Sequence, residues 1–286
     1  MLKKETHETS EQENGLVVKL GSLGALVNFQ LQFEKGLTPL KVRNTHLEKN
    51  GSPDSQTQDL LEESENFKKK FLLKPIADLL KKHPAFPFFS RVKGIGNENI
   101  AKVITFIDIN EADSISALWK YAGYAVTNGV ADHPTKGEKL SYNKELKNMC
   151  YRLGVAFLKA HSLSKNGTKL GHFFEKCLIE EKQKLEAQGK TVLPTEEWKK
   201  ETKKSEHPEN LCSEFYVHNR AFRRMVKLFL ACLWMYWRKA DNLPLRDPYS
   251  FEKQGHTTLI QPEELMDREL KVRRKRGQTV ERKQAV

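Results

Sequence analysis

The residue pattern with the clearest chemical potential is a pair of glycines that flank one isoleucine at positions 94–96. Two glycines permit a tight backbone reversal with positive φ and leave no side chain between the main chain and a ligand. Residues 97–104 predict an amphipathic helix after this turn, and the free N–H groups at a helix start attract phosphate. We therefore expect a helix-hairpin-helix that holds a phosphate backbone, although glycine also suits a plain corner between two helices. The residues predicted to contact phosphate here are Lys93, Gly94, Ile95, Gly96, Asn97 and Lys102.

A second group of cationic residues lies on the predicted helix over residues 217–239. Four of its basic side chains recur at three- and four-residue steps and therefore share one face. Guanidinium groups suit bidentate contacts with phosphate, which favours a binding stripe over a solvated basic face. Two further lysines lie in a polar loop before the predicted helix over residues 141–160. These additional nucleic-acid-binding candidates are Lys136, Lys139, Arg220, Arg223, Arg224 and Lys227.

The overall charge of the chain favours a polyanionic partner. The 286 residues include 49 Lys and Arg against 37 Asp and Glu, a formal net charge of +12. Basic proteins release condensed counterions when they bind nucleic acid, and this release drives association. The charge alone is also compatible with simple solubility, so it supports the motif without replacing it.

Other features of the sequence exclude several classes of protein. The longest apolar run, residues 228–237, is about half of the roughly 20 residues that a membrane-spanning helix needs. The first residues are polar, unlike a secretory signal, and the four cysteines form no CxxC pair, unlike a zinc ribbon or disulfide scaffold. His207, Cys212 and His218 are too irregularly spaced to favour a metal site. We expect a cytoplasmic protein with no cofactor of its own.

The patterning predicts a mainly α-helical fold with a small N-terminal β hairpin or meander. Residues 27–33 alternate apolar and polar side chains, and glycines at positions 21, 24 and 36 punctuate the region, which is typical of short strands. Most of the remaining chain follows helical periods. We expect a disordered tail at 1–14, the β element and a linker at 15–56, a helical domain with the helix-hairpin-helix at 57–188, a surface insertion at 189–211, a C-terminal helical region at 212–270 and a basic tail at 271–286.

The run over residues 92–108 and the helix that ends in Tyr-Ala-Gly-Tyr at 121–124 resemble one transposase domain. It is the C-terminal domain of DEDD-type insertion-sequence transposases, the bridge-RNA-guided recombinases. In that family a helix-hairpin-helix leads to a helix with a YxGL-like turn, then to a polar loop with Lys-Gly and a basic helix that begins near an Asn. Lys136-Gly137 and Asn143 match the last two features. The resemblance covers about a quarter of the chain.

This resemblance implies a DNA-binding protein related to mobile elements, one that grips the duplex backbone. The family's N-terminal RNase-H-like domain carries four metal-binding carboxylates, and residues 1–75 are too short to form it. Mg²⁺ chemistry would therefore require a partner that supplies this domain. Whether the chain is an enzyme is left open, with the balance against activity when it is alone.

The family also carries a nucleophilic serine in the loop after the Tyr-Gly turn. Ser141 is the one weak candidate here, and its position shortly before a predicted helix favours an N-cap over a nucleophile. Two alternatives to plain DNA binding remain: a serine-type recombinase or transposase subunit that needs a partner chain, and a module that binds structured RNA. The implied partners are DNA or structured RNA, with a second copy of the chain or a transposase subunit. A nucleoid-associated location follows for a bacterial or archaeal protein.

Overall fold

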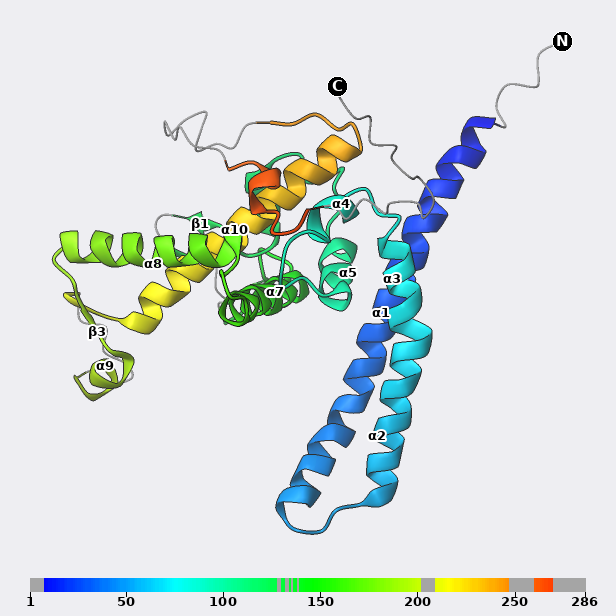
Figure 1. The fold of residues 1–286 in the computed structure, drawn as a ribbon, viewed down its shortest axis with the longest axis horizontal. Helices are drawn as coiled ribbons and strands as arrows, with labels where there is room; N and C mark the ends of the chain where they lie inside the picture. The colour runs from blue at the N-terminus through cyan, green and yellow to red at the C-terminus, as the bar shows by residue number, and fades with distance from the viewer. Residues whose placement is uncertain are drawn as a thin grey trace, which may run out of the picture.

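The computed structural model describes residues 8–127, 130–131, 134, 136–137, 139–201, 209–246 and 260–269, with side chains from residue 22 onward except at 127 and 130. The fold is mainly helical, which confirms the predicted class (Figure 1). A long helical arm at the N-terminal end projects from a body that contains the remaining helices. The predicted basic tail at 271–286 lies outside the described residues.

The first element shows that the predicted N-terminal β element is wrong. α1 is a single helix over Glu8–Lys49, and it also includes part of the predicted tail. The apparent alternation at 27–33 consists of two helical pairs with four-residue spacing. Val27 is buried in the core with Leu31 packed against it, whereas Phe29 and Phe33 stack on another face. Apolar burial therefore selects the helix, although glycine lowers helix stability by about 1 kcal/mol relative to alanine.

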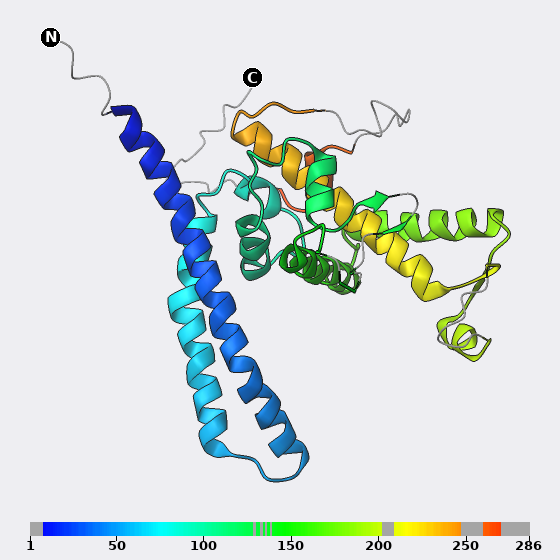
Figure 2. The ribbon, with the colours of Figure 1, turned by 180° about the vertical axis from the view of Figure 1, so that it is seen from behind.

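The arm is a hairpin of helices. α2 spans Ser55–Phe67, and the chain continues through the π-helical segment η1, Lys68–Leu73, into α3, Lys74–Leu80. These helices run back beside α1, as opposite views show (Figures 1 and 2). Asp54 begins the return by accepting the N–H of Gln56 as the N-cap of α2. At the base of the arm, α1 and α3 pack against the body.

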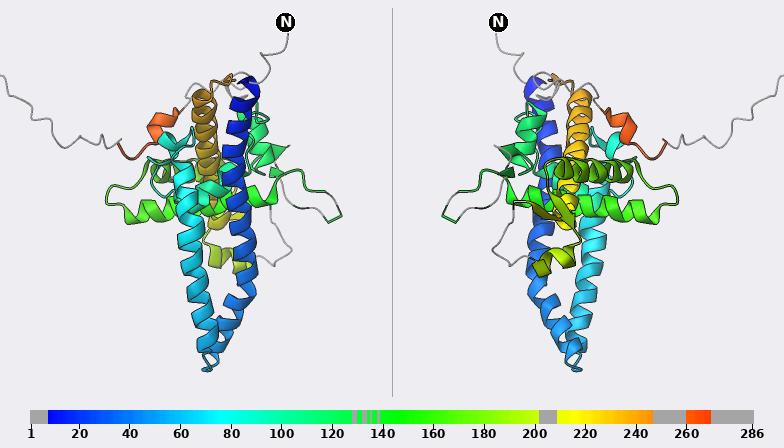
Figure 3. Two further views of the ribbon diagram at one scale, coloured as in Figure 1. Left: turned by 90° about the vertical axis from the view of Figure 1, so that its right-hand side faces the viewer. Right: turned by 90° about the vertical axis from the view of Figure 1, so that its left-hand side faces the viewer.

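The body is built around α10, which spans Glu214–Ala240. α8, Lys169–Ala187, packs against α10, and α7, Lys144–Leu163, contacts both. α5, Asn97–Thr105, covers α7, and α6, Ile115–Tyr121, covers α10. The arm lies in front of this helical group when the molecule is seen from the arm's side, and behind it when seen from the opposite side (Figure 3). The largest fully buried apolar side chains include Trp234, Phe88, Phe89, Phe157 and Phe229.

Short strands connect the helices of the body. β1, Val126–Thr127, pairs antiparallel with β2, Val130–Ala131. β3, Thr191–Leu193, pairs in parallel with β4, Leu211–Ser213, which leads directly into α10. The predicted insertion at 189–211 contains β3, the helix α9, Thr195–Glu201, and the first residue of β4, while residues 202–208 lie outside the described residues. No helix in the described ranges is long and apolar enough to cross a membrane.

Candidate nucleic-acid interface

The two-glycine turn lies between α4, Phe86–Phe89, and α5. Gly94 has a φ of +92°, and a Cβ on it would lie 2.8 Å from the carbonyl oxygen of Ala156 and 3.1 Å from the Cβ of Ala160. Both the positive φ and the close approach to α7 therefore require glycine. Ile95 packs against the hydrophobic core. Since α4 is a single helical turn, a helix-hairpin-helix stays a prediction.

The main chain of this turn holds an anionic group that belongs to the protein itself. The N–H of Lys93 donates to Asp267 Oδ2 at 2.8 Å, and the N–H of Lys169, at the start of α8, donates to Asp267 Oδ1 at 2.8 Å. The carbonyl oxygen of Arg91 accepts the N–H groups of Asp267 and Arg268 at 3.0 and 3.1 Å. The part of the turn that sequence reasoning assigned to phosphate therefore binds a carboxylate from the segment after η2, Pro262–Leu265.

The open part of the turn is the start of α5. Gly96 and Asn97 are exposed, and no side chain caps the helix at Gly96. A Cβ on Gly96 would meet no heavy atom within 4 Å. These two residues are accessible to a ligand, but the turn contributes fewer accessible amides than the sequence pattern predicts.

Lys102 is a buried residue, contrary to its predicted place beside a phosphate. Its Nζ donates to Glu34 Oε2 at 2.8 Å and to Glu98 Oε1 at 3.0 Å. Burial acts to raise the pKa of Glu34, but the hydrogen bonds and the Lys102 charge outweigh it and lower that pKa to about 2. The ammonium therefore joins the arm to α5. The four-residue spacing of Glu98 and Lys102 was a visible signal of this pairing.

The predicted arginine stripe on α10 is largely occupied by α8. Arg220 Nε lies 2.6 Å from Glu181 Oε2, and Arg224 contacts Glu180 at 2.7 Å and Glu181 at 3.2 Å. The Glu181 side chain is buried, so these ion pairs fix α8 against α10. Arg223 donates to the carbonyl oxygen of Ala125 at 3.2 Å. These guanidinium groups therefore hold neighbouring segments of the protein together, which leaves less of their hydrogen-bonding capacity for a phosphate.

Lys227, the last residue of the predicted stripe, is also enclosed. Its Nζ lies 4.0 Å from the centre of the Trp119 ring, whose Nε1–H donates to the Lys227 carbonyl oxygen at 3.0 Å. Burial, reinforced by Arg223 and Arg224, lowers the pKa of Lys227 to about 8. This lysine therefore packs α6 against α10 and presents little surface to a phosphate.

The other predicted lysines, Lys136 and Lys139, are exposed in the segment that connects the end of α6 to the start of α7. Asn143 joins these elements: its N–H donates to the Tyr121 carbonyl oxygen at 2.8 Å, and its Nδ2 donates to the Tyr121 hydroxyl at 2.9 Å. Lys147 Nζ lies 4.1 Å from the centre of the Tyr142 ring. We call this region the lysine surface, and its basic residues are Lys120, Lys136, Lys139, Lys144 and Lys147.

Sequence reasoning found two members of the lysine surface and missed three. Lys120, Lys136, Lys139 and Lys144 are exposed and form no ion pair with a described residue. Lys120 and Lys144 border the Tyr-Gly turn and Asn143, and that adjacency in sequence was the available signal. Gly94 lies against Ala156 of α7. Lys144 is 12 residues earlier on this helix, which corresponds to a distance of about 18 Å along its axis. The two-glycine turn and the lysine surface are therefore separate regions of the protein.

Ser141 is exposed and does not cap α7, contrary to the favoured interpretation. The N-cap is Asn143, whose Oδ1 accepts the N–H of Leu146 at 3.0 Å. Within the part of the chain that the structure describes, no histidine or carboxylate hydrogen-bonds to the Ser141 hydroxyl. A serine nucleophile needs such a base, so this geometry gives Ser141 no activation.

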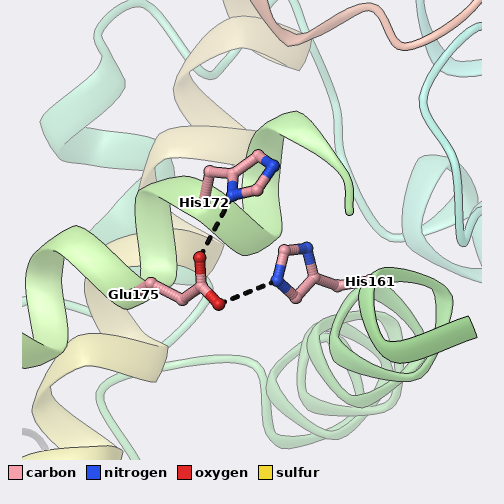
Figure 4. Close-up of side chains that lie close together, drawn as sticks. All are labelled: His161, His172 and Glu175. Atoms are coloured by element: carbon pink, nitrogen blue, oxygen red, sulfur yellow. Dashed lines mark hydrogen bonds and ion pairs between the residues drawn. The ribbon is translucent and has the colours of Figure 1, made fainter. Parts of the chain in front are cut away.

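A histidine–glutamate cluster joins α7 to α8 (Figure 4). His161 Nε2 and His172 Nδ1 each lie 3.1 Å from an oxygen of Glu175. The three ligand atoms are close enough to consider a metal ion. However, His161 Nδ1 accepts the Thr168 N–H at 2.9 Å, which places the ring hydrogen on Nε2, where a metal would have to bind. The cluster therefore fits a hydrogen-bonded helix junction better than a metal centre.

His172 is the exposed histidine of this junction. Its Nε2 lies 3.0 Å from the carbonyl oxygen of Asn166, so both ring nitrogens face acceptors. The Asn166 carbonyl, together with Glu175, raises the pKa of His172. The hydrogen bonds of His172 to Glu175 and to the Asn166 carbonyl thus tie the start of α8 to the turn that precedes it.

Comparisons with protein-family models, with curated proteins and with solved structures find no match to this chain.

Proposed function

We propose that the protein binds nucleic acid, with duplex DNA as the favoured ligand, through the lysine surface. The observation that carries this proposal is the exposure of four lysines that no described carboxylate neutralises, on two helix ends and the segment between them. Ammonium groups contact phosphate as point charges and carry no base-specific geometry. Binding is therefore expected to be largely independent of sequence.

The resemblance to the transposase domain supports the same surface. The matched positions are in contact with one another: Asn143 hydrogen-bonds to Tyr121, and a Cβ on Gly123 would lie 2.8 Å from the Tyr142 ring and 2.9 Å from Lys147. We propose that the protein works in the setting of a mobile element or derives from one. A cytoplasmic location, on the nucleoid in a bacterium or archaeon, belongs to this proposal.

The test removes two charges from the lysine surface and the same number elsewhere. Lys139→Gln with Lys144→Gln should weaken duplex binding about tenfold or more at 0.1 M salt and reduce the slope of log K against log salt by about 1.8. The matched control is Lys49→Gln with Lys182→Gln, two exposed lysines on α1 and α8 that form no ion pair with described residues. Fluorescence anisotropy with a labelled duplex measures both variants.

The outcomes separate the alternatives. Equal losses in both double variants would show a net-charge effect and overturn the assignment to this surface. Tighter binding to a structured RNA than to a duplex of equal charge, at matched salt, would replace DNA by RNA as the ligand. An absence of salt-dependent binding to either would remove the proposal.

A further inference from the structure

Four phenylalanines form a continuous ladder across the arm. The ring centres of Phe29 and Phe33 lie 6.4 Å apart, those of Phe33 and Phe67 5.5 Å, and those of Phe67 and Phe71 5.1 Å. The ladder thus passes from α1 to the junction of α2 and η1. Phe29, Phe67 and Phe71 are 52%, 40% and 51% exposed.

Such a ladder is costly to leave in water. Full burial of one phenylalanine is worth about 1.5–3 kcal/mol, and contiguous apolar patches of this kind mark interaction sites. The arm has only two helices side by side, so its outer face has no third layer within the described part of the chain (Figures 1 and 3). We therefore expect the ladder to be covered by a binding partner.

The charged residues beside the ladder indicate which kind of partner fits it. Asp59 and Glu63 precede Phe67 by eight and four residues, and Lys70 and Lys74 follow it by three and seven. The four-residue step places Asp59 and Glu63 on one flank of α2. The wider turn of the π-helical η1 keeps Lys70 and Lys74 on the same side of the phenylalanines. All four are exposed, and none forms an ion pair with another described residue. The flank is thus acidic before Phe67 and basic after it.

The order of charges on this flank, acidic and then basic, is complementary to the same flank of an antiparallel copy. Position 63 and position 70 have the same midpoint as position 59 and position 74, and Phe67 lies next to that midpoint. In an antiparallel pair of identical helices, residues on the same flank at equal distances from a two-fold axis face each other. Such an axis beside Phe67 brings Glu63 opposite Lys70 and Asp59 opposite Lys74. Parallel pairing about an axis along the helices would instead turn this flank away from its copy, so these charges would not meet.

We propose that a second copy of this chain docks on the phenylalanine ladder, with its arm antiparallel, about a two-fold axis beside Phe67. The interface is isologous, so each contact occurs twice. The ladders supply apolar burial, and the two charged segments set orientation and register. A polyanion or an anionic lipid surface fits this face poorly, because Asp59 and Glu63 flank the rings.

The first experiment measures the oligomeric state of the full chain by sedimentation velocity over a range of concentrations. We expect a dimer for the wild type and at least a tenfold weaker dimer for Phe67→Ser with Phe71→Ser. Phe215→Ser, at an exposed phenylalanine of α10, is the matched control and should leave the dimer intact. Circular dichroism checks that each variant is folded. A monomeric wild type, or a dimer that the double variant does not weaken, would overturn the proposal.

The second experiment tests orientation by exchanging charges. Asp59→Lys with Glu63→Lys makes the flank wholly basic, and Lys70→Glu with Lys74→Glu makes it wholly acidic, so each variant should lose its homodimer. All four substitutions in one chain reverse both segments and should restore it. Failure of the fourfold variant to dimerise more tightly than both double variants would exclude the antiparallel register. Since DNA binding is measured separately at the lysine surface, the two proposals can fail independently.

Discussion

His83 illustrates how one buried side chain couples protonation to folding. The residue is buried, its Nδ1 accepts the N–H of Ala85 at 3.1 Å, and its ring meets the edge of Trp237 with ring centres 4.5 Å apart. This environment accommodates the neutral imidazole, which alone can accept at Nδ1. Burial lowers the pKa of His83 from 6.5 to about 4.

The resulting prediction concerns stability in mild acid. Between pH 6.5 and 4 the unfolded chain binds a proton at His83 that the folded chain does not, so the free energy of unfolding should fall as the pH decreases through this window. The loss amounts to about 3 kcal/mol at its limit. His83→Asn retains an acceptor for Ala85 and cannot titrate, so its unfolding free energy, from urea titrations at several pH values, should change less. The exposed His46→Gln is the control and should retain the wild-type slope.

Cationic residues show what a single sequence can and cannot predict at this scale. The sequence shows which basic residues share a face of α10, but the carboxylates that pair with them lie in distant segments of the chain. Glu181 lies 39 residues before Arg220, and Glu34 lies 68 residues before Lys102. Only the fold brings these carboxylates to the basic side chains. Lys136 and Lys139 are exposed, and their contact with nucleic acid stays a prediction.

At the scale of elements, the pairing of α8 with α10 depends on one buried carboxylate. Glu181→Gln should lower the free energy of unfolding by about 2 kcal/mol, because it leaves Arg220 without a charged partner and Arg224 with Glu180 alone. Both arginines are partly exposed, which keeps the loss below that of a fully buried pair. The neighbouring Glu180→Gln is the matched control and should cost less than about 1 kcal/mol. Chemical denaturation checks both, and equal losses would contradict a special role of Glu181.

The spacing of apolar residues does not always distinguish a helix from a strand. A stretch with apolar residues at 27, 29, 31 and 33 satisfies a strand with two-residue alternation and a helix with two four-residue stripes. The alternation predicts strands here although the region is helical, because its second stripe lies outside the core: Phe29 is exposed in the arm and Phe33 is half-buried. The pattern predicts α7 because this helix has one apolar face that the body buries, and it predicts α10 because a long apolar run, buried on all sides over 229–235, forms its second half. The parallel pairing of β3 with β4 depends on contacts that no local pattern reveals.

At the scale of the whole molecule, arm and body differ in how they are stabilised. The body surrounds α10 with four other helices, whereas the arm beyond its base has only α1 against α2 and η1 (Figure 2). Few buried side chains occur in the outer arm: within α2, Thr57 alone is buried. Two helices with so little burial gain little from tertiary packing, which supplies most helix stability in proteins. The arm should therefore open without unfolding the body.

Hydrogen exchange measures this difference directly. Amides of α2 should exchange at least about a hundredfold faster, after correction for intrinsic rates, than amides near the middle of α10, because local opening requires less free energy than global unfolding. If two arms pair through the phenylalanine ladder, protection of α2 should rise with protein concentration, whereas protection of α10 should not. Phe67→Ser with Phe71→Ser is the control in which this dependence disappears. Equal protection of α2 and α10 in dilute protein would instead mean that the arm and body unfold as one cooperative unit.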